Sequence, residues 1–172
     1  MAEAPATPDE LFARLDALGI AHATVRHAPV FTVDQAKGHR GEIRGGYSKN
    51  LFLKDKQDRL FLGVTLEDVA VDLKALSPLI GAGRLSFASS ELLREHLGVE
   101  PGSVTPFALI NDRANRVTPV LDQAMLDEPS LHFHPLVNDA TTAIASPDLL
   151  RFVAACGHRP LILRFPRRSA PV

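Results

Sequence analysis

The sequence predicts an α/β fold, in which helices pack on the outside of a curved, mixed β-sheet. Short runs rich in Val, Leu, Ile and Phe recur along the whole chain, as strands do. Some of these runs are separated by hairpin turns and others by helices with clear end signals. Such connections produce both antiparallel and parallel strand pairs. No repeat or low-complexity linker divides the 172 residues, so we expect one domain over residues 1–172, with a core at 8–165.

The predicted helices are marked by their ends. Thr7 supplies an N-cap hydroxyl, Pro8 occupies the first helical position, and Glu10 completes a capping box. Apolar residues then repeat on one face until Gly19, a residue typical of helix C-caps. By the same criteria, further helices begin at Ser90 and Ser146 and end at Gly98 and Gly157, a shorter one covers residues 73–79, and another starts near Thr32.

The predicted strands are short, and two of the connections between them have the composition of hairpin turns. Gln57 and Asp58 separate two apolar runs, and the polar residues 111–115 separate two more. The strand-like runs are residues 21–26, 49–54, 60–64, 85–87, 107–110, 117–121, 131–133, 142–145 and 161–165.

The composition narrows the possible functions. A net charge of −1 gives no sign of a generally basic surface, so any contact with RNA is local. The single cysteine, Cys156, excludes an internal disulfide and favours a reducing, intracellular compartment. Residues 1–8 lack the basic and apolar segments of a signal peptide, and no apolar run approaches the roughly 20 residues that span a bilayer. We therefore expect a cytoplasmic protein with no membrane partner.

The first candidate site is the Gly-rich, basic segment at residues 39–50, which runs directly into a strand. Gly45 and Gly46 permit backbone conformations that other residues avoid. Lys49, at the start of the strand, could hold a phosphate or polarise a carbonyl as a point charge. A solvated lysine beside a flexible loop explains the same pattern, and spacing alone favours that interpretation slightly. The segment lacks the GxxxxGK[ST] spacing of a P-loop.

The second candidate is the loop at residues 98–106, which follows a helix and precedes an apolar run. Two glycines and two prolines fix its shape, and its free N–H groups could point at one oxygen or phosphate. A stiff connector between two elements is the alternative explanation, and it is favoured when the loop is considered alone.

The third candidate contains two histidines that are two residues apart on a predicted strand. His132 and His134 therefore point to the same face, which raises the possibility of a metal site. Because no third His, Cys or paired carboxylate stands close in sequence, we expect no metal. A hydrogen-bonding role for His134 with Asn138 and Thr141 is favoured, and a turn stabilised by these side chains explains the pattern equally well.

Other polar residues give weaker signals. Cys156 lies on the apolar face of a predicted helix, where a cysteine is more often a core residue than a nucleophile. The remaining groups are an acidic surface and cap cluster (Glu67, Asp68 and Asp72) and a small basic end (Arg164, Arg167 and Arg168). This end could touch RNA, but a solvated tail is favoured, and we expect residues 167–172 to be loose.

Taken together, these segments resemble the YbaK/prolyl-tRNA-synthetase-associated editing domain. The resemblance runs over nearly the whole chain, and its last segment is similar to the free-standing PrdX/ProXp-ala branch. The segments that carry it are YSKNLFLKD (47–55), VDLKALSPLIGAGRLSFAS (71–89), GVEPGSVTPFALIND (98–112) and FHPLVNDATTAIASPDLLRF (133–152).

The resemblance implies a hydrolase that removes mischarged alanine from proline tRNA in trans. A synthetase pocket sized for proline cannot strongly reject the smaller alanine, so a second site removes the error. The implied partner is the acceptor stem and 3′ end of an aminoacyl-tRNA. Prolyl-tRNA synthetase is a further candidate partner, and we expect no binding to DNA. The alternatives are a deacylase for another small amino acid, such as Cys or Ser, or a non-catalytic tRNA- or nucleotide-binding module.

The resemblance also implies roles for individual residues. Lys49 would hold the phosphate or ester region of the terminal adenosine, and the N–H groups of the loop would stabilise the oxyanion. His134 is the one titratable candidate near neutrality, although the substrate's own 2′-hydroxyl is also expected to help activate water. No cofactor is implied. The loop residues that carry these N–H groups are Gly102, Ser103 and Val104. The residues expected to surround the substrate are Tyr47, Asn50, Thr105, Asn138 and Thr141. The acceptor stem is expected to contact Arg84 and Lys37.

Overall fold

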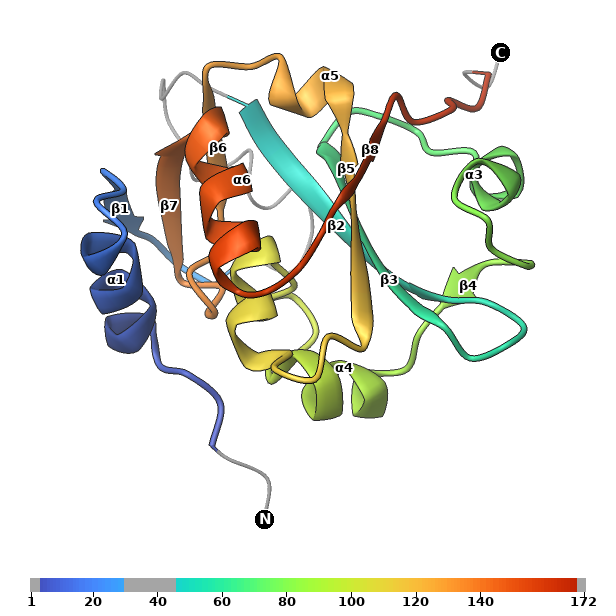
Figure 1. Ribbon diagram of the computed structural model, residues 1–172. Helices are drawn as coiled ribbons and strands as arrows, with labels where there is room; N and C mark the ends of the chain where they lie inside the picture. Colours follow the sequence, from blue (N-terminus) through green and yellow to red (C-terminus); the bar gives the residue numbers. More distant parts are fainter. Residues whose placement is uncertain (1–3, 30–45, 170–172) are drawn as a thin grey trace.

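The computed structural model describes residues 4–29 and 46–169 and is a mixed α/β structure, as predicted (Figure 1). Lys37 and the helix expected near Thr32 lie outside the described residues. The elements are α1 (Pro8–Ala17), β1 (Ala23–Arg26), β2 (Gly46–Lys54), β3 (Leu60–Leu66), α3 (Leu73–Leu79), β4 (Ser86–Phe87), α4 (Ser90–Leu97), the 3-10 helix η1 (Pro106–Asn111), β5 (Val117–Asp122), α5 (Gln123–Leu126), β6 (Ser130–Phe133), β7 (Ala140–Ala145), α6 (Ser146–Ala155) and β8 (Leu161–Leu163).

Within the described residues, the strands form one mixed sheet in the order β1-β7-β6-β2-β3-β5-β8, and β4 pairs with β2 outside this path. The β2/β3 hairpin turns at Asp58, which has a positive φ of 60° as tight turns often require. The β6/β2, β3/β5 and β5/β8 pairs are parallel, whereas β1/β7, β6/β7 and β2/β4 are antiparallel.

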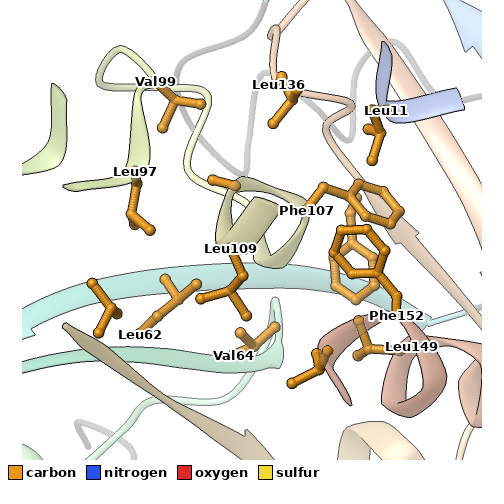
Figure 2. Packing of buried hydrophobic residues seen from close by; sticks show 14 of the residues in the cluster. Leu11, Leu62, Val64, Leu97, Val99, Phe107, Leu109, Leu136, Leu149 and Phe152 are labelled. Carbon is orange, nitrogen blue, oxygen red and sulfur yellow. The ribbon is translucent and has the colours of Figure 1, made fainter. Parts of the chain in front are cut away.

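The sheet has a hydrophobic cluster on each face. One cluster takes Phe52 and Leu62 from the sheet and packs them against α1, α4, η1 and α6. Phe107 of η1 lies at its centre, with its ring at a near-right angle to Phe152, 5.4 Å away (Figure 2). The other cluster takes Leu53 and neighbouring side chains from the opposite face and packs them against α3. Successive residues of β2 therefore point to different clusters, as the pleat of a strand requires.

Two sequence-based expectations about residues 107–115 are wrong. The apolar run at 107–110 belongs to η1 rather than to a strand, so residues 111–115 are not a hairpin turn between strands. Thr105 caps this helix by accepting a hydrogen bond from the N–H of Phe107, and Pro106 occupies the first position. The run is buried on every side, with exposures of 0–1% from Phe107 to Leu109, and thus has no periodicity that separates strand from helix.

The basic end of the chain is held more firmly than expected. The N–H of Asp72 donates to the carbonyl of Pro166, and the N–H of Arg168 donates to the carbonyl of Ala70. An isolated bridge pairs Val71 with Arg167. Residues 166–168 are consequently attached beside the start of α3, so the expectation of a loose tail is corrected for Arg167 and Arg168.

Candidate active site

The candidate site begins where β2 and β6 part. The two strands pair in parallel at Gly46–Leu131 and Tyr47–His132, and the Ser48 hydroxyl donates to the carbonyl of His132. Further along β2, Leu53 and Lys54 pair with β4. Among the described residues, β2 has no strand partner on this side over residues 49–51, and we call this interruption of the strand pairing the opening.

The strand register brings three predicted site residues to one level beside this opening. The last β2/β6 pair is Tyr47–His132, so Lys49 and His134 each follow it by two residues and lie on the same face of their strands. Continuing the β6/β7 register by one residue places His134 opposite Thr141. Directly opposed residues share a face of a sheet, so Lys49, His134 and Thr141 form a row across β2, the end of β6 and β7. We call these three residues the site row.

His134 has a fixed orientation within the site row. Its Nδ1 lies 3.1 Å from the carbonyl oxygen of Ala140. Because a carbonyl only accepts hydrogen bonds, this contact assigns the ring proton to Nδ1 and leaves Nε2 as the basic nitrogen. Burial lowers the pKa of His134, the hydrogen bond to Ala140 opposes this, and the nearby His27 lowers the pKa further. The ring is therefore biased toward the neutral form, which can accept a proton.

Lys49 is half-buried beside charges of both signs. Burial lowers its pKa first, Arg168 lowers it further, and Asp68 raises it. Two cations held near each other favour an anionic ligand between or beside them. Arg168 comes from the tail attached to Ala70, so this charge reaches the site through the chain end that we expected to be loose.

Asn50 follows Lys49 but points to the opposite face, on the side of the cluster that contains Phe52. Its Oδ1 is buried and has no hydrogen-bond partner within the described chain. A buried acceptor without a donor costs free energy, on the order of 1–3 kcal/mol, and such atoms are rare in folded proteins. Asn50 can therefore accept a hydrogen bond from a ligand or a water molecule.

The loop at 98–106 has one N–H group already committed. Gly102 has a φ of 93°, which favours glycine, and the N–H of Ser103 donates to the carbonyl of Glu100 across this turn. In the described part of the chain, we find no acceptor for the N–H groups of Gly102 and Val104. The loop therefore has two N–H groups without an acceptor among residues 4–29 and 46–169. The Thr105 hydroxyl is fully buried and serves as the cap of η1.

The loop and the turn after β6 meet over η1. Val99 from the loop and Leu136 from the turn belong to the same cluster and lie on the same side of η1 (Figure 2). Leu136 is buried and has a φ of 71°, a strained conformation for a branched side chain. Such strain costs roughly 1–3 kcal/mol and is concentrated at functional sites. This packing joins the loop to the turn after β6 on the η1 face of the sheet, which is the face of Asn50 and is opposite to the side chains of the site row.

The other predicted site residues are placed as follows. Tyr47 stacks on His132 with ring centroids 4.3 Å apart, so the ring of His132 packs against an aromatic ring. Asn138 lies in the turn between His134 and β7. Arg84 is exposed just before β4, which pairs with the far end of β2, about 16 Å along the strand from Lys49. The structure thus does not bring Arg84 to the site row.

Other groups give no second catalytic centre in the described part of the chain. Burial raises the pKa of Cys156 to about 11, so its thiol is a poor nucleophile at neutral pH. No three His, Cys, Asp or Glu side chains within residues 4–29 and 46–169 gather closely enough to hold a metal ion. Among the described helices, none has the length and apolar character needed to cross a membrane.

A family model described as "Aminoacyl-tRNA editing domain" matches residues 27–152. The chain belongs to this family. This editing-domain protein is 41% identical over 158 residues to prolyl-tRNA synthetase associated domain-containing protein 1 of Danio rerio, covering 91% of this chain and 86% of the relative. It is 35% identical over 149 residues to prolyl-tRNA editing protein ProX of Acetoanaerobium sticklandii, covering 86% of this chain and 91% of the relative.

Solved structures share the fold of this editing-domain protein. One is described as a candidate trans-editing enzyme for prolyl-tRNA synthetase; it superposes with a TM-score of 0.69 at 18% identity, over 94% of this chain and 97% of its own. Another, a hypothetical protein, gives a TM-score of 0.73 at 17% identity. The resemblance found in the sequence is thereby confirmed, as is the mixed α/β fold.

One residue of the site was not found by sequence analysis. His27, just after β1, lies with its ring centroid 6.4 Å from that of His134, and its Nε2 is 2.7 Å from the Thr141 hydroxyl. It is 107 residues from His134 along the chain and carries no local motif. Only the pairing of β1 with β7 brings it to the site row.

Proposed function

We propose that this protein hydrolyses the ester bond of mischarged aminoacyl-tRNA, with alanine on proline tRNA as its substrate. The observation that carries the proposal is the site row, in which a half-buried cation, an oriented imidazole and a hydroxyl lie on one face of neighbouring strands, where β2 and β6 part. This combination suits an ester that has a phosphate on one side and a small acyl group on the other.

His134 is suited to act as the general base. Its Nε2 accepts a proton from water, and the resulting hydroxide attacks the ester carbonyl carbon. The C–O bond to the ribose then breaks, the ribose oxygen takes up a proton, and the free amino acid leaves. A general base of this kind contributes about 10²- to 10⁴-fold to a rate. The 2′-hydroxyl of the substrate lies close to the same carbonyl and can assist this proton transfer.

The loop at 98–106 is suited to stabilise the negative charge that develops on the carbonyl oxygen. The N–H groups of Gly102 and Val104 are the donors, because the N–H of Ser103 already bonds to Glu100. Backbone donors that are fixed before the reaction need no reorganisation when the charge forms, which is why oxyanion holes contribute strongly to catalysis. The rigid turn at Gly102 supports this role.

Lys49 is suited to anchor the 3′ end of the tRNA. Its charge and that of Arg168 attract the phosphate next to the terminal adenosine, and burial strengthens the interaction relative to an exposed lysine. Asn50 faces the other way and offers its buried carboxamide oxygen to the acyl group or to water. Lys49 thus binds the substrate and does not act as a base.

The preference for alanine follows from size. Cognate proline must be excluded while alanine enters, and an editing site that admits only the smaller amino acid achieves this. The names of two relatives, an editing protein and a prolyl-tRNA synthetase associated domain protein, support proline tRNA as the carrier.

The test is deacylation of a panel of labelled tRNAs, namely alanyl-, cysteinyl-, seryl- and prolyl-tRNA(Pro), with purified protein. We expect alanyl-tRNA(Pro) to be hydrolysed fastest and prolyl-tRNA(Pro) to stay intact. A rate for every substrate no higher than that in buffer would refute catalysis, and faster release of Cys or Ser would reassign the specificity.

Lys49→Ala tests the anchoring role. We expect kcat/KM to fall by roughly 10- to 100-fold, as for the loss of a charged hydrogen bond, because the tRNA end loses a cation. Lys56→Ala, in the exposed β2–β3 turn, is the matched control and should keep wild-type activity. Circular dichroism establishes that both variants are folded; unchanged activity in a folded Lys49→Ala protein would favour a structural lysine.

A further inference from the structure

His27 is held by three contacts to neighbouring backbone and side-chain atoms. Its N–H donates to the carbonyl of Asp139 at 2.9 Å, which attaches the end of β1 to the turn before β7. Its ring Nδ1 lies 2.8 Å from the carbonyl oxygen of Ala28, and its ring Nε2 lies 2.7 Å from the Thr141 hydroxyl. Both ring nitrogens are therefore occupied, and the ring cannot rotate without losing both contacts.

These contacts determine which way the Thr141 hydroxyl points. The carbonyl of Ala28 can only accept, so the ring proton of neutral His27 is on Nδ1. Nε2 is then an acceptor, and the Thr141 hydroxyl must donate its one hydrogen to it. The lone pairs of the Thr141 oxygen remain, so toward the site row this hydroxyl acts as an acceptor only.

The two ends of the site row then favour ligand groups of opposite charge. Lys49 and the nearby Arg168 favour an anion at the β2 end. Thr141 offers an acceptor at the β7 end, on the far side of His134. Between them, neutral His134 adds no positive charge that would repel a cationic group at Thr141.

We propose that Thr141, oriented by His27, binds the α-ammonium group of the aminoacyl ester. This inference rests on the proposed function and adds the part of the substrate that is recognised. An ammonium group has three donors and no acceptor, which matches an acceptor-only hydroxyl. It is one carbon away from the reacting carbonyl, so binding it fixes the ester relative to His134. His27 acts through Thr141 and is a positioning residue.

The test compares two esters with the same carbon skeleton, alanyl-tRNA(Pro) and propionyl-tRNA(Pro), which lacks the amine. Each rate is divided by the rate of hydrolysis in buffer, because the amine itself makes an ester more reactive. We expect the wild-type protein to favour the alanyl ester by roughly 10- to 100-fold, the range for a charged hydrogen bond. Thr141→Val should remove most of this preference by slowing the alanyl ester alone.

Two further sets of variants make the result specific. Thr24→Val is the matched control: the Thr24 hydroxyl lies 2.7 Å from that of Thr142 between the same two strands but on the opposite face, so its loss should keep the preference. His27→Ala should weaken the preference, and His27→Gln, which keeps an acceptor, should restore part of it.

The outcomes separate the two proposals. If the folded wild-type protein hydrolyses neither ester, the proposed function fails. If it hydrolyses both with equal acceleration, or if Thr141→Val slows both equally, only the recognition of the ammonium group is refuted.

Discussion

Two histidines of this molecule differ in their hydrogen-bond partners and in their burial. His158 follows α6, and its Nε2 is 2.8 Å from Asp112 at the end of η1; each side chain is only 2% exposed. His134 is half-buried beside the opening between β2 and β6, and its partner within the described residues is a backbone carbonyl. The first ring is closed off from any substrate, whereas the second keeps a basic nitrogen for one. Burial and the choice of partner therefore separate a structural histidine from a functional one.

The His158–Asp112 pair joins elements that are far apart in the sequence. Burial alone would raise the pKa of Asp112, but hydrogen bonds from His158 and from the N–H groups of Val117 and Arg116 lower it on balance. The carboxylate thus fixes the end of η1, the start of β5 and the residues after α6 in one arrangement. Since η1 follows the loop at 98–106, this pair supports the site from a distance.

His134→Gln is the change with the largest expected effect on activity. The variant loses the basic nitrogen, so we expect kcat for alanyl-tRNA(Pro) to fall by about 10²- to 10⁴-fold. The midpoint of chemical unfolding should change little, because the ring contributes one hydrogen bond to a carbonyl. His22→Gln is the control, since His22 stacks on Phe12 and bonds to Asp16 away from the site row. Activity within a few-fold of wild type would exclude His134 as the base.

His158→Ala should show the opposite behaviour. Removal of the ring takes from the buried carboxylate of Asp112 its one side-chain partner among the described residues and leaves two backbone N–H donors, and we expect a loss of about 3 kcal/mol in the free energy of unfolding. The midpoint in urea measures this loss, while kcat per folded molecule should stay near the wild-type value. A stable variant with a large loss of kcat would mean that the two histidines are not functionally distinct.

The same pair gives a pH dependence with a definite sign. Because the pKa of Asp112 is lowered in the folded state, its stabilising contribution is complete above the usual range near pH 4 and is lost as the pH falls through the lower, folded value. In His158→Ala, which lacks one of the groups that lower this pKa, stability should decline less steeply below pH 4. An unchanged slope in urea midpoints between pH 4 and pH 2.5 would contradict this account.

The sequence was informative where one residue determines a local structure. The capping box of Thr7 and Glu10 and the left-handed C-cap at Gly98 are present as predicted. The helix at 146–155 also begins where expected, although Ser146 donates to the carbonyl of Glu128 and Ala145 is the N-cap. These features depend on neighbours within four residues, which a sequence shows directly.

The site row could be predicted only in part, because strand pairing creates it. The residue types and flanking motifs of Lys49, His134 and Thr141 mark each as a candidate, but that they share one face follows from the pairing of β2, β6 and β7. His27 has no motif and was missed, and Arg168 was expected to be in a solvated tail. η1 was missed because a run buried on all sides has no periodicity. Strand pairing between distant segments and the structure of a fully buried run cannot be predicted from the pattern of neighbouring residues.

The smallest expected effect distinguishes His134 from its neighbour His27. Because burial lowers the pKa of His134, the acid limb of kcat/KM should lie below the usual histidine range near 6.5, with full activity above it. His27 lowers the same pKa slightly, so His27→Ala should move the acid limb upward while reducing the maximal rate through Thr141. His158→Ala, which changes no charge near His134, should leave the limb in place. A limb that stays fixed in His27→Ala would mean that the two rings affect each other only through the Thr141 hydrogen bond, and a limb that moves in His158→Ala would show that the buried pair and the site are coupled.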